Sequence, residues 1–145
     1  MINDLYQETI LDHSRSPRNF RLLEDANRQA EGYNPLCGDK CKVFLKENNG
    51  VIDTVTFQGA GCAISTASAS LMTEVLKGKT VDEAETLLAK FHDLLTTDQP
   101  MAQDLGKLVV FSGVREFPAR VKCATLAWHT LREALRGAGE AVSAK

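Results

Sequence analysis

The sequence has little net charge, no long apolar run and no basic or apolar leader. Its 17 Lys and Arg nearly balance its 19 Asp and Glu, giving a formal net charge of -2. Charge therefore gives no reason to expect nucleic acid or an acidic membrane surface as a partner. The longest apolar runs, such as Val109-Val110-Phe111, are far too short to cross a bilayer. Because the first residues also lack the pattern of a secretory signal, we expect a cytoplasmic protein.

The chain also lacks internal repeats and any change of composition that would mark a second domain. Its 145 residues, 43% of them apolar and 25% charged, have the composition of an ordinary globular protein. A chain of this length can bury roughly 70% of its unfolded surface. We therefore expect one domain over residues 1–145, with a frayed tail over 138–145.

Paired CxxC motifs, the usual spacing of zinc fingers, are absent, although the chain has four cysteines. Cytosolic thiols are kept reduced, so structural disulfides are not expected. A single cysteine in an apolar helix is often a small buried hydrophobe. Four cysteines beside glycines and an aspartate instead favour metal or redox chemistry.

A β-hairpin is predicted near the middle of the first half of the chain. Residues 39–47 and 51–58 read as strands, with Asn48-Asn49-Gly50 as the turn. Helical periodicity and capping residues predict helices over 3–13, 63–77, 80–92, 102–111 and 118–136. Residues 15–34 show no periodicity and are locally basic. This segment is interpreted either as a partner-docking arm or as a solvated connection that wraps the domain.

Hairpin geometry predicts which cysteines meet. A turn centred near Asn49 pairs residues whose numbers sum to about 98 or 99, which places Cys37 opposite residue 61 or 62. Cys62 also directly precedes a predicted helix, where free backbone N–H groups favour a thiolate. Cys123 falls in the first turns of the last helix. We therefore expect Cys37, Cys62 and Cys123 to surround a common point.

The fourth ligand of such a site is either Asp39 or Cys41, which share a face of a regular strand with Cys37. At about 3.3 Å per residue, Cys37 lies roughly 7 Å from Asp39 and roughly 13 Å from Cys41. One metal ion can bridge the shorter gap, and the longer one only if Gly38 bends the chain. Asp39 is therefore predicted as the ligand. The resulting four-coordinate site suits Zn²⁺ or an iron–sulfur cluster.

The three histidines, His13, His92 and His129, lie in or at the ends of predicted helices. They are interpreted as surface or packing residues rather than as ligands.

Three motifs resemble those of the IscU/NifU-N family, and most closely its SufU-type branch. They are Asn-Pro-x-Cys-Gly-Asp at 34–39, Gly-x-Gly-Cys-x-Ile-Ser-x-Ala-Ser-Ala-Ser at 59–70 and Phe-Pro-Ala-Arg-Val-Lys-Cys-Ala-Thr-Leu-Ala-Trp at 117–128. The resemblance implies an α+β fold in which a small antiparallel sheet of about three strands carries several helices on one face. It also implies a role in iron–sulfur cluster assembly with a cysteine desulfurase as partner. By position, the metal-site motif matches Cys37, Asp39, Cys62 and Cys123.

The resemblance also bears on the branch. In the IscU branch a histidine directly precedes the last cysteine, whereas Lys122 stands there in this chain. Lys122 and the long segment 93–118 resemble the SufU branch, which binds zinc and accepts persulfide sulfur. This implies a zinc-dependent sulfur acceptor for a SufS-type desulfurase, with Cys123 as the hypothesised acceptor; whether the transfer makes it an enzyme is left open.

Two alternative functions remain. The same residues could be a scaffold for a transient [2Fe–2S] cluster that is passed to downstream assembly proteins, or a purely structural zinc site. Cys41 has no role in the family pattern.

Overall fold

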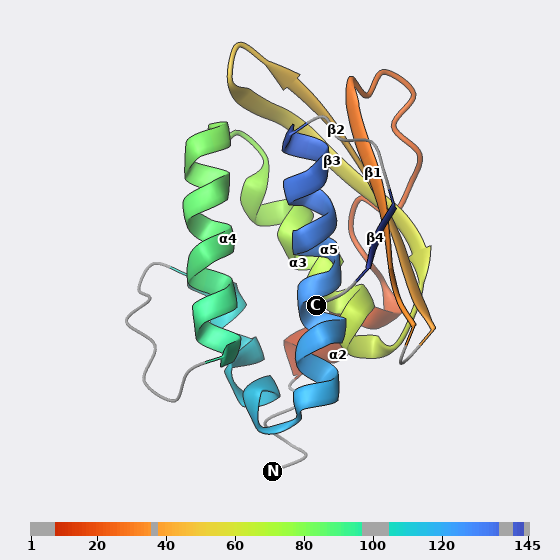
Figure 1. The fold of residues 1–145 in the computed structure, drawn as a ribbon, viewed down its shortest axis with the longest axis vertical. Coiled ribbons are helices and arrows are strands. Elements are labelled where there is room, and N and C mark those ends of the chain that lie inside the picture. Colours follow the sequence, from red (N-terminus) through yellow and green to blue (C-terminus); the bar gives the residue numbers. More distant parts are fainter. Residues whose placement is uncertain (1–7, 36–37, 97–104, 137–140, 144–145) are drawn as a thin grey trace.

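The computed structural model describes residues 8–35, 38–96, 105–136 and 141–143. Its elements follow one another as α2 (Glu8–Arg15), β1 (Arg28–Asn34), β2 (Asp39–Asn48), β3 (Val51–Ala60), α3 (Ala63–Leu76), α4 (Val81–Thr96), the 3-10 helix η1 (Gly106–Glu116), α5 (Pro118–Arg136) and β4 (Ala141–Ser143). The strands form one sheet in the order β3-β2-β1-β4. The helices lie on one side of this sheet (Figure 1).

The architecture confirms the predicted α+β fold. Strands β1, β2 and β3 are antiparallel. Helices α3 and α5 contact the sheet directly, and α4 and η1 pack beyond them, against α5 and each other. Apolar side chains from the inner sheet face and from these helices form one continuous core. No helix among the described residues is long and apolar enough to span a membrane.

The hairpin of β2 and β3 forms where the sequence predicts it. Asn49 and Gly50 adopt positive φ angles of 54° and 81°, as a tight two-residue hairpin turn requires. Asn48 pairs with Val51, but an irregularity at Lys46/Glu47 shifts the rest of the ladder by one residue. The predicted register therefore holds only next to the turn. The predicted position of Cys37 opposite residue 61 or 62 lies outside the described residues.

Strand β1 was not predicted, because its inward positions carry no apolar pattern. Its residues alternate between exposed and buried, and the buried positions are Ala30, Gly32 and Asn34. The largest side chain of this stretch, Tyr33, points to the exposed side. A strand whose inner face is small or polar gives no hydrophobic period of two.

The basic segment before β1 wraps around the sheet. The carbonyl oxygen of Asn19 accepts a hydrogen bond from the backbone N–H of Phe57, at the free edge of β3. Farther along, the side chain of Asn27 donates to the carbonyl oxygen of Glu47 and accepts from its N–H, at 2.7 and 2.9 Å. Asp25 pairs with Lys46 at 2.9 Å. These contacts agree with the interpretation of this segment as a connection that wraps the domain.

The three histidines lie on helices, with His13 buried, His129 half-buried and His92 exposed. His13 on α2 is only 3% exposed, and its Nδ1 lies 2.7 Å from Ser70 Oγ on α3. Burial is the main cause that lowers the pKa of His13. The rings of His92 and His129 meet edge to face across α4 and α5, with centroids 6.0 Å apart.

The C-terminal half differs from prediction in two places. The helix expected over 102–111 is instead a 3-10 helix over Gly106–Glu116. Of the tail expected to fray, residues Ala141–Ser143 pair in parallel with β1 as β4. The helix predicted over 118–136 is confirmed as α5. Ala124, Trp128 and Leu131 on it are buried, and Trp128 stacks on Phe91 with ring centroids 4.7 Å apart.

Candidate metal centre

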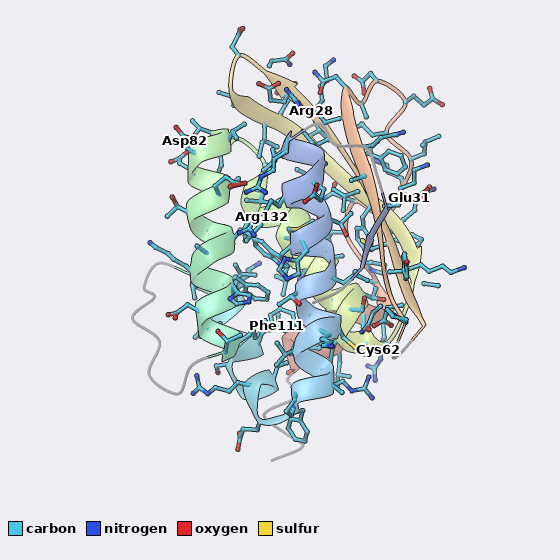
Figure 2. The ribbon with its side chains drawn as sticks, in the orientation of Figure 1. Arg28, Glu31, Cys62, Asp82, Phe111 and Arg132 are labelled. Atoms are coloured by element: carbon cyan, nitrogen blue, oxygen red, sulfur yellow. The ribbon has the colours of Figure 1, made fainter. Side chains whose placement is uncertain are left out.

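Three of the four predicted ligands come together at one end of the sheet. Asp39 begins β2, Cys62 precedes α3, and Cys123 lies in the second turn of α5. One ligand atom from each lies within 4.8 Å of the others. Figure 2 shows Cys62 at this end of the fold, with Arg28 at the opposite end. Cys37 lies outside the described residues, so its place as the fourth ligand stays a prediction.

Cys62 is the N-cap residue of α3. Its backbone is extended, with φ -72° and ψ 172°, and its Sγ accepts a hydrogen bond from the N–H of Ser65 at 3.5 Å. A side chain that caps a helix in this way satisfies one of the free N–H groups of the first turn. The cap therefore fixes the sulfur at the positive end of the helix.

The Asp39 carboxylate is held in place from two sides. Its Oδ1 accepts the backbone N–H of Cys62 at 3.0 Å, and its Oδ2 lies 3.5 Å from the side-chain amide of Asn34. A Cβ atom at Gly61 would lie 2.7 Å from Oδ1. Any larger residue at position 61 would therefore displace the Asp39 carboxylate from its present position.

The two described thiols of the site differ in exposure. Cys62 is partly exposed, whereas Cys123 is fully buried. A hydrogen bond from Cys123 is the main cause that lowers the pKa of Cys62 to about 6, with the N–H of Ser65 contributing. These donors favour the thiolate form of Cys62.

Polar groups also surround the sulfur of Cys123. The Asn34 amide lies 3.7 Å from it, and an Arg120 guanidinium nitrogen lies 4.0 Å away. The Cys123 thiol also points at the carbonyl oxygen of Ala119, at 3.6 Å. An amide and a cation beside a buried sulfur are the surroundings that a charged ligand needs.

The donor set fits a zinc ion or an iron–sulfur cluster. Ligand atoms about 2.0–2.3 Å from a tetrahedral zinc lie about 3.3–3.8 Å apart, so atoms within 4.8 Å need move little. Two thiolates and a carboxylate are ligands that zinc accepts, and thiolates are the usual ligands of iron–sulfur clusters. The donor set alone does not distinguish the two.

Cys41 lies outside this cluster, as strand spacing predicts. Gly38 does bend the chain, with a φ of 73°, yet the group of clustered donors does not include Cys41. Its side chain belongs to the apolar core, and burial raises its pKa to about 12. Its environment is that of a buried hydrophobe.

Three residues around the site had no role in the sequence interpretation. Asn34 belongs to the first motif, but its position beside Asp39 depends on the unpredicted pairing of β1 with β2. Gly61 adjoins a predicted ligand, although only the structure shows what its missing Cβ would touch. Arg120 could have been found from its helical spacing, three residues before Cys123.

Comparison with known proteins agrees with this arrangement. Residues 5–135 match the model of the NifU-like N terminal domain. The zinc-dependent sulfurtransferase SufU of Bacillus subtilis (strain 168) is 38% identical over 133 residues, which cover 91% of this chain and 90% of that protein. The iron–sulfur cluster assembly scaffold protein IscU of Streptococcus pyogenes serotype M1 is 37% identical over 141 residues, covering 97% and 88%.

A solved structure shares the fold over nearly the whole chain. It is described as a putative iron–sulfur cluster assembly scaffold protein for the SUF system from Fervidobacterium islandicum AW-1. It superposes with a TM-score of 0.86 at 34% identity, covering 92% of this chain and 98% of that one. Relatives named SufU and IscU are almost equally similar, so identity alone does not separate the two branches. From the matched model and these relatives, the chain belongs to the NifU/IscU family.

Proposed function

We propose that this protein acts in iron–sulfur cluster assembly as a zinc-dependent acceptor of persulfide sulfur from a cysteine desulfurase. The observation that carries the proposal is the meeting of Asp39, Cys62 and Cys123 at the ends of three elements. The relative named a zinc-dependent sulfurtransferase supports the choice of chemistry. Lys122, which replaces the histidine typical of the IscU branch, favours zinc over a cluster.

The chain itself supplies the ligands for the metal. Cys62 and Cys123 would bind zinc as thiolates and Asp39 as a carboxylate, with Cys37 as the predicted fourth ligand. When bound, zinc would stabilise the thiolate forms of the cysteines. The N–H of Ser65 and the amide of Asn34 stabilise negative charge on Cys62 and Cys123.

Sulfur transfer itself is a thiol exchange. The acceptor thiolate attacks the outer sulfur of the desulfurase persulfide, forming a new S–S bond as the old one breaks. The desulfurase cysteine leaves as a thiolate, and the protein keeps a persulfide. The exchange needs no external oxidant or reductant, and the donor is a SufS-type desulfurase.

Cys123 is the proposed acceptor. Because it is buried, sulfur transfer to it requires a change in the surrounding structure. Its side chain is fully buried, whereas Cys62 is partly exposed. A desulfurase persulfide therefore reaches Cys123 only after the surrounding residues move on docking. Cys37 and Cys62 are the alternative acceptors. The mass spectrometry described next distinguishes them from Cys123.

Two measurements test the function. Addition of the zinc-loaded protein should raise the turnover of a SufS-type desulfurase with cysteine as substrate. Mass spectrometry of the product should then find one extra sulfur, 32 Da, on the Cys123 peptide. No stimulation and no added sulfur would overturn the proposed function, and sulfur on Cys37 or Cys62 would overturn only the assignment to Cys123.

The second candidate function is a scaffold for a [2Fe–2S] cluster on the same site. The high identity to proteins named IscU scaffolds favours it. Metal analysis of protein purified without added metal separates the two functions. Stoichiometric zinc supports the sulfur acceptor, whereas iron with acid-labile sulfide supports the scaffold.

A further inference from the structure

We infer that Asn34 is a positioning residue of the metal centre, whose side-chain amide holds Asp39 and Cys123 at the spacing that a metal ion needs. The inference rests on the same site as the proposed function, but it concerns metal binding alone and not sulfur transfer. The observation behind it is a single buried amide that contacts ligands on two different elements.

The position of Asn34 follows from the sheet. It is the last residue of β1 and pairs directly with Asp39, the first residue of β2. Its carbonyl oxygen accepts the N–H of Gly38 at 2.8 Å, which closes the connection between the two strands. Asn34 is only 1% exposed. Strand pairing and this backbone bond therefore fix where its side chain starts.

The side-chain amide of Asn34 carries two hydrogens, and the atoms of two proposed ligands lie near it. Its nitrogen lies 3.5 Å from Asp39 Oδ2 and 3.7 Å from Cys123 Sγ. A side-chain amide can donate one hydrogen to each. The same group thus links the start of β2 to the second turn of α5, the two elements that supply these ligands.

No other donor among the described residues is shown to contact both ligands. The backbone N–H of Cys62 donates to Asp39 Oδ1, and the Arg120 guanidinium lies beside the sulfur of Cys123. Asp39 and Cys123 carry like charge once both bind a cation, as a carboxylate and a thiolate, and a donor shared between them offsets that repulsion. Hydrogen-bond donors that orient metal ligands are commonly worth 10- to 100-fold in metal affinity.

The chemistry of asparagine is specific for this position. An ionised aspartate of the same shape would have no hydrogens to donate and would place a second carboxylate beside Asp39. A leucine of similar volume would fill the space without any polar contact. Both substitutions remove the donor at similar volume, but only leucine does so without adding a charge.

The experiment uses the full chain and measures zinc affinity by competition with a chromophoric chelator. We expect Asn34→Leu to bind zinc about 10- to 100-fold more weakly than the unmodified chain. Cobalt(II) then reports the coordination directly, because its visible absorption bands depend on ligand geometry. Both variants should change these bands.

Asn27→Ala is the matched control. Asn27 lies before β1, and its amide makes two hydrogen bonds with Glu47, so this substitution removes comparable contacts far from the site. Its zinc affinity and cobalt spectrum should equal those of the unmodified chain. Far-UV circular dichroism establishes that each variant is folded; if Asn34→Leu does not fold, the cobalt spectrum of Asn34→Asp decides.

Unchanged zinc affinity and an unchanged cobalt spectrum in a folded Asn34 variant would overturn the inference. Equal weakening by Asn27→Ala would also overturn it, because the effect would then reflect general stability. The outcome is separate from that of the proposed function. Loss of zinc affinity in Asn34→Leu supports the inference even if the unmodified chain fails to stimulate a desulfurase.

Discussion

Cys41 and Cys62 show how differently one fold can treat the same side chain. Cys41 is two residues from Asp39 along β2, but it is 5% exposed and belongs to the apolar core, where burial raises its pKa to about 12. Cys62 caps a helix beside Cys123, and its pKa is lowered to about 6. Hydrogen-bond donors outweigh desolvation at Cys62, and desolvation acts alone at Cys41.

The boundary between these environments falls within a single strand. The inward side chains of β2 run from Asp39 through Cys41 to Val43 and Leu45, all of them buried. Only the first of them reaches the free N–H groups at the start of α3 and the amide of Asn34. The site is therefore defined by the donors at the end of the sheet rather than by the number of cysteines nearby.

The largest expected effect is on zinc affinity, when alanine replaces Cys62 rather than Cys41. Cys62→Ala removes a proposed ligand. Structural zinc binding is worth about 10–16 kcal/mol in total, so we expect the loss of one ligand to weaken zinc affinity roughly 100-fold or more. Cys41→Ala should leave the affinity unchanged. Chelator competition measures both. Loss of zinc binding in a folded Cys41→Ala protein would contradict the separation of Cys41 from the site.

Substitutions at two glycines compare the surroundings of the metal site with those of Cys41 without changing a cysteine. A Cβ at Gly61 would press on the Asp39 carboxylate, whereas a Cβ at Gly59 would overlap the backbone carbonyl of Lys40, beside Cys41. We expect Gly61→Ala to weaken zinc binding about 10-fold by displacing the carboxylate. Gly59→Ala should instead lower the free energy of unfolding by about 1–3 kcal/mol.

Zinc competition and urea unfolding, performed on both glycine variants, separate these effects. The reverse pattern, with the larger metal effect at Gly59, would show that the strand and not the carboxylate controls the site. Equal stability loss in both variants with normal zinc affinity would contradict the role given to Gly61.

Alkylation of the metal-free protein measures the difference between the thiols directly. Iodoacetamide reacts with thiolates, so the rate at Cys62 should level off above pH 6 and fall about tenfold per pH unit below it. Cys41 should react only after urea is added, because it is buried and its pKa is raised. Peptide mass spectrometry assigns the modified residue. Fast labelling of Cys41 in the native protein would remove the contrast between them.

The sequence predicted the parts of the site that depend on motif and spacing. Asp39, Cys62 and Cys123 could be placed together from a hairpin and two helix starts, and strand spacing separated Cys41 from them. It could not predict β1, because the inward positions at its site end, Ala30, Gly32 and Asn34, are small or polar. Without β1, no pattern in the sequence could reveal that Asn34 faces Asp39.

The smallest expected effect is the contribution of His13 to the pH dependence of stability. Like Cys41, His13 is buried and its pKa is shifted chiefly by desolvation. Burial disfavours the charged form in both cases, so it raises the pKa of the Cys41 thiol and lowers that of the His13 imidazole. The unfolded chain therefore binds a proton at His13 more readily than the native protein does. The contribution to stability is fully present above the unfolded pKa of about 6.5 and is lost as the pH falls below it.

This contribution can be measured by urea unfolding of the metal-free protein. The free energy of unfolding is determined at pH 7.5 and 5.5 for the unmodified chain and for His13→Gln. The slope from one group cannot exceed about 1.4 kcal/mol per pH unit. We expect less, because Glu74 lies 3.7 Å from His13 Nε2 and would pair with the protonated ring. Arg18 opposes that gain. The unmodified chain should lose more stability on acidification than His13→Gln, whereas an equal loss would mean that Glu74 offsets the full cost of burying the charge.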